Sequence, residues 1–124
     1  MLFINALKNS RRNHHLALGA TACLALVIAY FTLTPLPKFS FSGGDKLYHL
    51  IGFAALMIPA AVLYRRALRW LLPSAIAFGG LIEILQPYVN RQAEWADFFA
   101  DGFGAILGVI IGLILRRLFR QVFD

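Results

Sequence analysis

The chain has few acidic residues, little charge of either sign and almost no cysteine. Only 6 of its 124 residues are Asp or Glu, and charged residues make up 15% of the chain against 60% for hydrophobic residues. A soluble domain of this length needs far more polar surface, so the composition indicates a membrane protein. The single cysteine, Cys23, excludes an internal disulfide. Because Cys23 lies within an apolar run, we interpret it as a buried structural thiol.

The sequence also lacks the features of a nucleic-acid-binding protein and of the common enzyme motifs. Its 12 basic residues give a formal net charge of +6. They cluster at the ends of apolar runs, as in membrane proteins, and do not form one basic surface, so we expect no nucleic-acid partner. No nucleophile elbow, phosphate-binding loop, CxxC or HExxH sequence is present. Motifs therefore do not decide whether the protein is an enzyme.

Four apolar runs are each close to the roughly 20 residues that a helix needs to cross a bilayer. They predict an all-α, polytopic membrane protein with a single domain over residues 1–124. The first run is followed by Pro35 and Pro37 without a signal-cleavage motif, so we interpret it as an uncleaved membrane helix. The predicted helices are 15–35, 46–64, 68–87 and 97–115.

The distribution of Lys and Arg predicts the orientation of these helices. Three basic residues lie in each of the N-terminal segment, the second connection (65–69) and the C-terminal segment, whereas Lys38, Lys46 and Arg91 lie on the other side. Since cytoplasmic loops carry the excess of basic residues, both termini should face the cytoplasm. We expect a multi-pass protein of the cytoplasmic (inner) membrane.

With this topology, the polar and ionisable residues near the helices gather on the extracytoplasmic side. An ionisable residue within a membrane helix is by default a hypothesis of function. At about 100° per residue, Gly79, Glu83 and Gln86 share one helical face, and Asp45 and His49 share another. The candidate polar site is Asp45, Lys46, His49, Glu83, Gln86, Arg91, Asp97 and Asp101.

Asp97 and Asp101 fall on one helical stripe with three glycines, Gly104, Gly108 and Gly112. Glycines spaced by four residues let two membrane helices approach closely. The stripe therefore predicts a helix–helix contact, and it points both aspartates toward a neighbouring helix.

Each of these residues also has a purely structural interpretation. A GxxxG pattern is commonly just a packing face, and Asp45 or Asp97 can simply cap a helix. His49 alone would be an ordinary hydrogen-bonded residue of the bundle. Glu83 lies about one turn inside the membrane and needs a partner, which Arg91, Lys46 or His49 could supply. Taken together, the residues favour a functional site.

The order of these residues resembles the VanZ-like family over roughly residues 30–115. The resemblance rests on "DKLYHLIGFAAL" (45–56) and "GLIEILQPYVNRQAEWADFFADGFGAILG" (80–108). These segments match the family pattern of D-K-x-x-H, E-x-x-Q, a loop arginine, and D-x-x-x-N-x-x-G-x-x-x-G. The chain departs from the pattern at Asp101, where the family more often has Asn.

The VanZ-like family takes its name from a membrane protein associated with resistance to the glycopeptide antibiotic teicoplanin. The resemblance implies a small polytopic protein of the cell envelope, with a link to glycopeptide resistance as an expectation, and it assigns no reaction.

Three functions remain open from the sequence. The first is recognition of an envelope lipid or lipid-linked precursor, such as a polyprenyl phosphate, with Arg91 and Lys46 holding the phosphate. The second is a membrane enzyme that uses His49 as a base or a divalent metal ion as cofactor. The third is a structural membrane protein that binds a partner or forms a homo-oligomer. The candidate metal ligands are His49, Glu83, Asp97 and Asp101.

Overall fold

A computed structural model describes residues 2–34, 44–89, 91 and 93–119 of the chain. These residues form four α-helices, two short 3-10 helices and no β-strand, which confirms the all-α prediction. The α-helices are α1 (Leu2–Leu33), α2 (Gly44–Leu63), α3 (Leu68–Leu85) and α4 (Trp95–Leu118). The 3-10 helix η1 (Arg65–Ala67) connects α2 to α3, and η2 (Gln86–Val89) follows α3.

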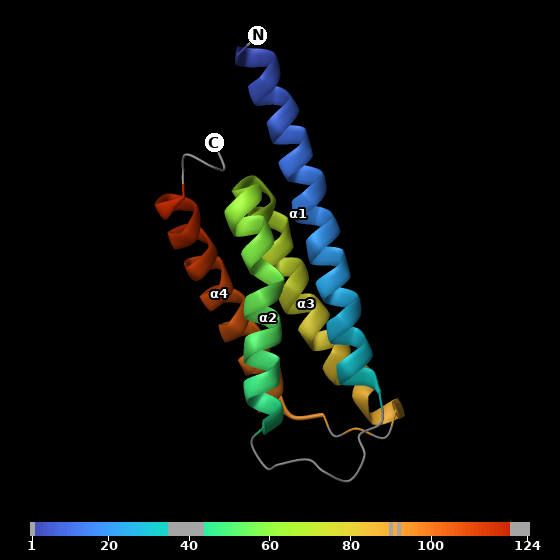
Figure 1. Cartoon of the computed structure of the whole chain (residues 1–124). Coiled ribbons are helices and arrows are strands. Elements are labelled where there is room, and N and C mark those ends of the chain that lie inside the picture. Colours follow the sequence, from blue (N-terminus) through green and yellow to red (C-terminus); the bar gives the residue numbers. More distant parts are fainter. Residues whose placement is uncertain (1, 35–43, 90, 92, 120–124) are drawn as a thin grey trace.

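Consecutive α-helices run in opposite directions, so the start of α1 and the end of α4 lie at the same end of the bundle (Figure 1). The opposite end contains the start of α2, the end of α3 and the start of α4. By length and composition, four helical segments can cross a membrane. They are Asn9–Leu33, Lys46–Leu63, Arg65–Val89 and Trp95–Leu118.

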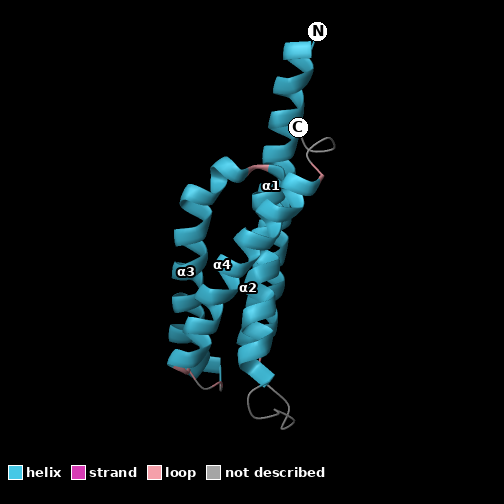
Figure 2. Ribbon diagram, turned by 90° about the vertical axis from the view of Figure 1, so that its left-hand side faces the viewer, coloured by secondary structure: helices cyan, strands magenta, loops and turns pink. Residues whose placement is uncertain are grey.

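The helix bounds differ from the predicted ones mainly in α1, which begins at Leu2 and not at residue 15. No proline or glycine interrupts residues 2–18, so the helix continues through the basic segment that the prediction treated as a flank. As a result α1 extends well beyond the other helices at that end (Figure 2). Helix α4 is also longer than predicted, from Trp95 to Leu118.

Large apolar side chains cover the outside of the bundle. Leu26, Phe31, Phe103 and Ile114 are examples that lie more than half exposed. Such a surface suits the hydrocarbon of a membrane, which is as apolar as these side chains.

The interpretation of Cys23 as a buried thiol is wrong, because its side chain is exposed on α1. An apolar run reveals that a helix is hydrophobic, but not which of its faces packs inward.

Helices α2 and α4 pack closely along the glycine stripe. A Cβ atom on Gly104 would overlap the backbone carbonyl oxygen of Leu50, and one on Gly108 would overlap that of Ala54. A Cβ on Gly112 would overlap the side chain of Ala61. Because glycine has no side chain, the two backbones can approach closely, as small residues allow between membrane helices. This contact sets the relative position of every other residue on the inner faces of α2 and α4.

The remaining core is built from medium and small apolar residues. Phe53 and Met57 of α2 are fully buried and belong to one cluster with Ala75 and Ile82 of α3 and Ala105 of α4. Burying such side chains in a tightly packed interior supplies dispersion contacts that lipid does not match as closely. The core thus holds α3 against the α2–α4 pair and brings their polar ends together.

Candidate functional site

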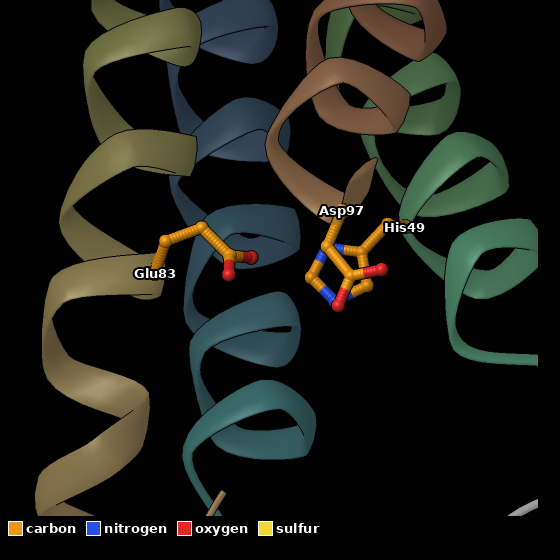
Figure 3. Close-up of side chains that lie close together, drawn as sticks. All are labelled: His49, Glu83 and Asp97. Atoms are coloured by element: carbon orange, nitrogen blue, oxygen red, sulfur yellow. The ribbon is translucent and has the colours of Figure 1, made fainter. Parts of the chain in front are cut away.

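Three helices bring a histidine and carboxylates together at the end of the bundle opposite the start of α1. His49 comes from the second turn of α2, Glu83 from the last turn of α3 and Asp97 from the first turn of α4. Each offers one ligand-type atom, and these atoms lie within 4.8 Å of one another. Figure 3 shows the Glu83 side chain directed toward the His49 ring and the Asp97 carboxylate. We call these residues, together with Asp101, the histidine–carboxylate cluster.

His49 and Asp101 form the innermost contact of the cluster. His49 Nδ1 and Asp101 Oδ1 are 2.6 Å apart, within hydrogen-bonding distance. His49 is only 4% exposed and Asp101 is fully buried. A hydrogen bond at one imidazole nitrogen fixes both the orientation of the ring and the position of its proton. With Asp101 accepting from Nδ1–H, the Nε2 atom of a neutral His49 carries the lone pair.

The Nε2 atom of His49 faces Asp97 without reaching hydrogen-bonding distance. It lies 4.0 Å from Asp97 Oδ2, and among the described residues it has no hydrogen-bond partner. Glu83 Oε1 and Asp101 Oδ2 are likewise buried without a partner within the described chain. Buried polar atoms are nearly always hydrogen-bonded, so three such atoms in one cluster indicate a place for a ligand, an ion or water.

The segment before α4 positions Glu83. The backbone N–H of Glu94, the N-cap residue of α4, donates to Glu83 Oε2 over 3.0 Å. The Glu94 side chain pairs with Lys46 at 3.8 Å, and both of these side chains are about half exposed. Such an exposed pair contributes roughly 0–1 kcal/mol. Its role is therefore chiefly geometric, because it links the starts of α2 and α4 beside the cluster.

Gln86 and Arg91, two further predicted site residues, bind the end of α1. Gln86 Nε2 donates to the carbonyl oxygen of Thr32 over 3.2 Å. Arg91 Nη1 lies 3.2 Å from the carbonyl oxygen of Thr34 and 3.4 Å from that of Phe31. The last carbonyl groups of a helix have no hydrogen-bond partner within the helix itself. Gln86 and Arg91 donate to carbonyl groups at this end of α1. Lys46 lies at the edge of the site, and the side chain of Asp45 falls outside the described part of the chain.

The pairing within the cluster differs from what the sequence suggested. Of the partners expected for Glu83, His49 lies in the same cluster, with ligand-type atoms within 4.8 Å, and the backbone N–H of Glu94 adds a hydrogen bond that was not expected. Asp45 shares a helical face with His49 in the sequence, but its side chain lies outside the described residues; the carboxylate that contacts the ring is Asp101. Glu94 itself was not among the predicted site residues. Contacts between helices depend on how the helices rotate, and periodicity within one helix does not supply that rotation.

Gly79 of α3 leaves the space that the Asp101 carboxylate occupies. A Cβ atom at Gly79 would lie 2.8 Å from Asp101 Oδ2, whereas one on the neighbouring Gly80 would meet only the ring of Phe98 at 3.4 Å. We expect Gly79→Ala to displace Asp101 and destabilise the bundle by about 1–3 kcal/mol, the usual range for overpacking. Thermal unfolding in detergent measures this, with Gly80→Ala as the matched control. Equal melting temperatures for the two variants would contradict the contact.

Comparison of the chain with protein-family models, with curated proteins and with solved structures gave no match.

Proposed function

We propose that this chain is a VanZ-like protein of the cytoplasmic membrane and that its histidine–carboxylate cluster recognises the head group of an envelope lipid. The proposal rests on one observation. The ligand-type atoms of His49, Glu83 and Asp97, which come from three apolar helices, lie within 4.8 Å of one another. Ionisable groups in membrane helices are costly in free energy and mark binding sites and pathways. The family assignment is supported by the order of the residues quoted above.

The depth of the cluster favours a head group over a lipid tail. His49 lies three residues after the start of the span Lys46–Leu63, and Asp97 two residues after the start of Trp95–Leu118. At about 1.5 Å of rise per residue, both lie within about 5 Å of the span ends. Tyr88 and Trp95 are exposed at the same end, as is usual for aromatic residues at a membrane–water interface. A phosphate at this depth would have Lys46 beside it.

The proposed orientation places this site on the extracytoplasmic face. Basic residues at 65, 66, 116 and 117 lie at the end of the bundle that contains the start of α1, whereas Lys46 and Arg91 lie at the other. The positive-inside rule then supports cytoplasmic termini and a site facing outward. A polyprenyl phosphate, whose phosphate lies in the head-group layer, is one lipid class that fits this location.

Cysteine labelling in cells tests the orientation. In a Cys23→Ala background, single cysteines at Ser42 and at Asn90 should react with a membrane-impermeant thiol reagent added outside. A single cysteine at Arg66 serves as the matched control and should react only after permeabilisation. The opposite pattern would place the site on the cytoplasmic face and exclude an extracytoplasmic head group.

Binding to lipids in nanodiscs tests recognition itself. The purified protein should bind polyprenyl phosphate at least tenfold more tightly than the corresponding uncharged polyprenol, because the phosphate accepts charge-assisted hydrogen bonds, with Lys46 as the donor beside the site. Equal affinity for the two lipids would mean that only the chain is bound and would contradict head-group recognition.

The contact between His49 and Asp101 also supports a catalytic form of the same function. A carboxylate on one imidazole nitrogen orients the other nitrogen to accept a proton, as in hydrolytic enzymes. Phosphate release from a polyprenyl pyrophosphate, lost in His49→Ala, would establish this form. Recovery of the lipid unchanged after long incubation would leave recognition as the function.

A further inference from the structure

We propose that His49 Nε2, Glu83 and Asp97 bind one divalent transition-metal ion, such as Zn²⁺ or Mn²⁺, and that Asp101 positions the histidine for it. The inference concerns the same cluster and rests on the proposal that this cluster is a functional site. Metal binding by the protein alone nevertheless requires no lipid, so the two proposals can be tested separately.

The orientation of His49 distinguishes a metal ligand from one half of an ion pair. A protonated His49 would donate from both nitrogens, and a charge-assisted bond to a carboxylate is about 2.8 Å long. The contact of Nδ1 with Asp101 is shorter still, at 2.6 Å, but Nε2 is 4.0 Å from Asp97 Oδ2. Nε2 is buried without a hydrogen-bond partner among the described residues, and so is Glu83 Oε1. A single ion between them would satisfy both atoms.

Asp101 fulfils the role that carboxylates commonly have behind metal-bound histidines. A histidine that binds a metal through one nitrogen usually donates its other N–H to a carboxylate, which fixes the tautomer and the ring orientation. The 2.6 Å contact between Asp101 and His49 Nδ1 supplies this arrangement, and Asp101 is fully buried. Gly79 leaves room for the Asp101 carboxylate on the other side. Asp101 is therefore a positioning residue and not a ligand.

The distances within the cluster are slightly larger than those around a bound ion. Ligand atoms around a tetrahedral ion with bonds of about 2.1 Å lie about 3.4 Å apart. The three candidate atoms lie within 4.8 Å of one another, so the most separated pair needs to approach by up to about 1.4 Å, which is within the reach of side-chain torsions. Since Glu83 comes from α3 and the others from α2 and α4, the ion would tie the three helices together.

Charge and ligand type favour a borderline transition-metal ion. The three ligand groups, a neutral histidine and two carboxylates, carry a charge of −2, which a divalent cation offsets in a region where unpaired charge is costly. The buried Asp101 adds one further negative charge, which accepts from the His49 ring. Mg²⁺ and Ca²⁺ prefer oxygen ligands alone, whereas imidazole with carboxylates suits ions such as Zn²⁺. Three protein ligands leave a position open, and a phosphate oxygen could occupy it. The cation would thereby overcome the repulsion between a phosphate and the carboxylates.

Metal analysis of the full chain tests the proposal. Protein purified in detergent through a tag without histidine is stripped with chelator, loaded with Zn²⁺ and desalted, and the bound zinc is measured by mass spectrometry. We expect about one ion per chain for the wild type, since a site of this kind binds metal once its ligands are deprotonated. Glu83→Gln and His49→Ala should bind at least tenfold more weakly, and Asp101→Asn should bind about 10–100-fold more weakly while still reaching saturation.

Two control variants identify the site that holds the ion. Glu94→Gln removes a half-exposed carboxylate at the same end of the bundle, and His14→Ala removes a histidine of α1 that packs on Tyr64 near the other end. Both should bind Zn²⁺ like the wild type. Because His49→Ala can destabilise the fold by leaving Asp101 buried without its partner, only variants with a cooperative thermal transition are compared, and Glu83→Gln provides the second test.

The outcomes separate the metal site from the proposed lipid function. One ion in the wild type, lost in Glu83→Gln, supports the metal site whether or not polyprenyl phosphate binds. A folded wild type that retains less than about one-tenth of an ion per chain after loading overturns it, as does equal zinc in Glu83→Gln and the wild type. Polyprenyl phosphate binding that persists in excess chelator leaves the lipid function standing without the metal. Zinc binding without any lipid binding overturns the lipid function alone.

Discussion

Gly108→Leu is expected to separate α2 from α4 and to abolish the site at their ends. A Cβ atom at Gly108 would overlap the backbone carbonyl oxygen of Ala54, and a helix backbone cannot move aside as a flexible side chain can. We expect a loss of about 3 kcal/mol or more. For a domain of this size that corresponds to a fall of roughly 10 °C or more in melting temperature.

Gly102 on the same helix supplies the matched control for this substitution. A Cβ atom there would meet nothing within 4 Å, and leucine favours a helix over glycine by up to about 1 kcal/mol. Gly102→Leu should therefore melt at or slightly above the wild-type temperature. Melting of Gly108→Leu at the same temperature as Gly102→Leu would mean that the glycine stripe faces lipid and does not contact α2.

In the protein loaded with Zn²⁺, His49→Ala and Glu83→Gln are expected to reduce binding of polyprenyl phosphate at least tenfold each, and together hardly more than either alone, because each removes a ligand of the ion that holds the phosphate. Residues that act as one unit show strongly non-additive effects, because removing one member already removes the function of the others. Their ligand-type atoms lie within 4.8 Å of each other, which is close enough for such coupling. Affinity measured in nanodiscs for the wild type, the two single variants and the double variant gives the coupling directly.

Two controls are needed to interpret this experiment. His14→Ala removes a histidine that packs on Tyr64 near the other end of the bundle, and it should bind the lipid nearly as the wild type does. Each variant must also unfold cooperatively, since a buried charge without its partner can destabilise a protein by itself. A double variant whose loss equals the product of the two single losses would show that His49 and Glu83 act independently.

The sequence predicted the helices and the identity of the buried polar residues better than their pairing. Length and hydrophobicity are enough to recognise four segments that can cross a membrane. The four-residue spacing of Gly104, Gly108 and Gly112 with Asp101 was also enough to predict one packed face, because that spacing is a property of a single helix. Both features are properties of a single segment, so the sequence of that segment is enough to predict them.

The contacts between side chains of different helices depend on how the helices rotate and tilt against one another. The sequence of a single helix does not determine that rotation or tilt. Gln86 shares a helical face with Glu83, yet its amide bonds the end of α1 because α3 also packs near that helix. Asp101, four residues beyond Asp97, reaches His49 only because the glycines bring α4 against α2. The start of α1 was missed for a different reason. Its basic residues indicate where a membrane span ends, but they do not interrupt a helix.

An experimental structure determined with polyprenyl phosphate and Zn²⁺ tests most directly whether the histidine–carboxylate cluster is the binding site. The account predicts head-group density at the ends of α2, α3 and α4, in contact with His49, Glu83 and Asp97 of the cluster. Anomalous scattering at the zinc edge would show separately whether an ion lies within it. Lipid density confined to the apolar outer surface of α4, with the cluster closed on itself by direct hydrogen bonds, would contradict the account.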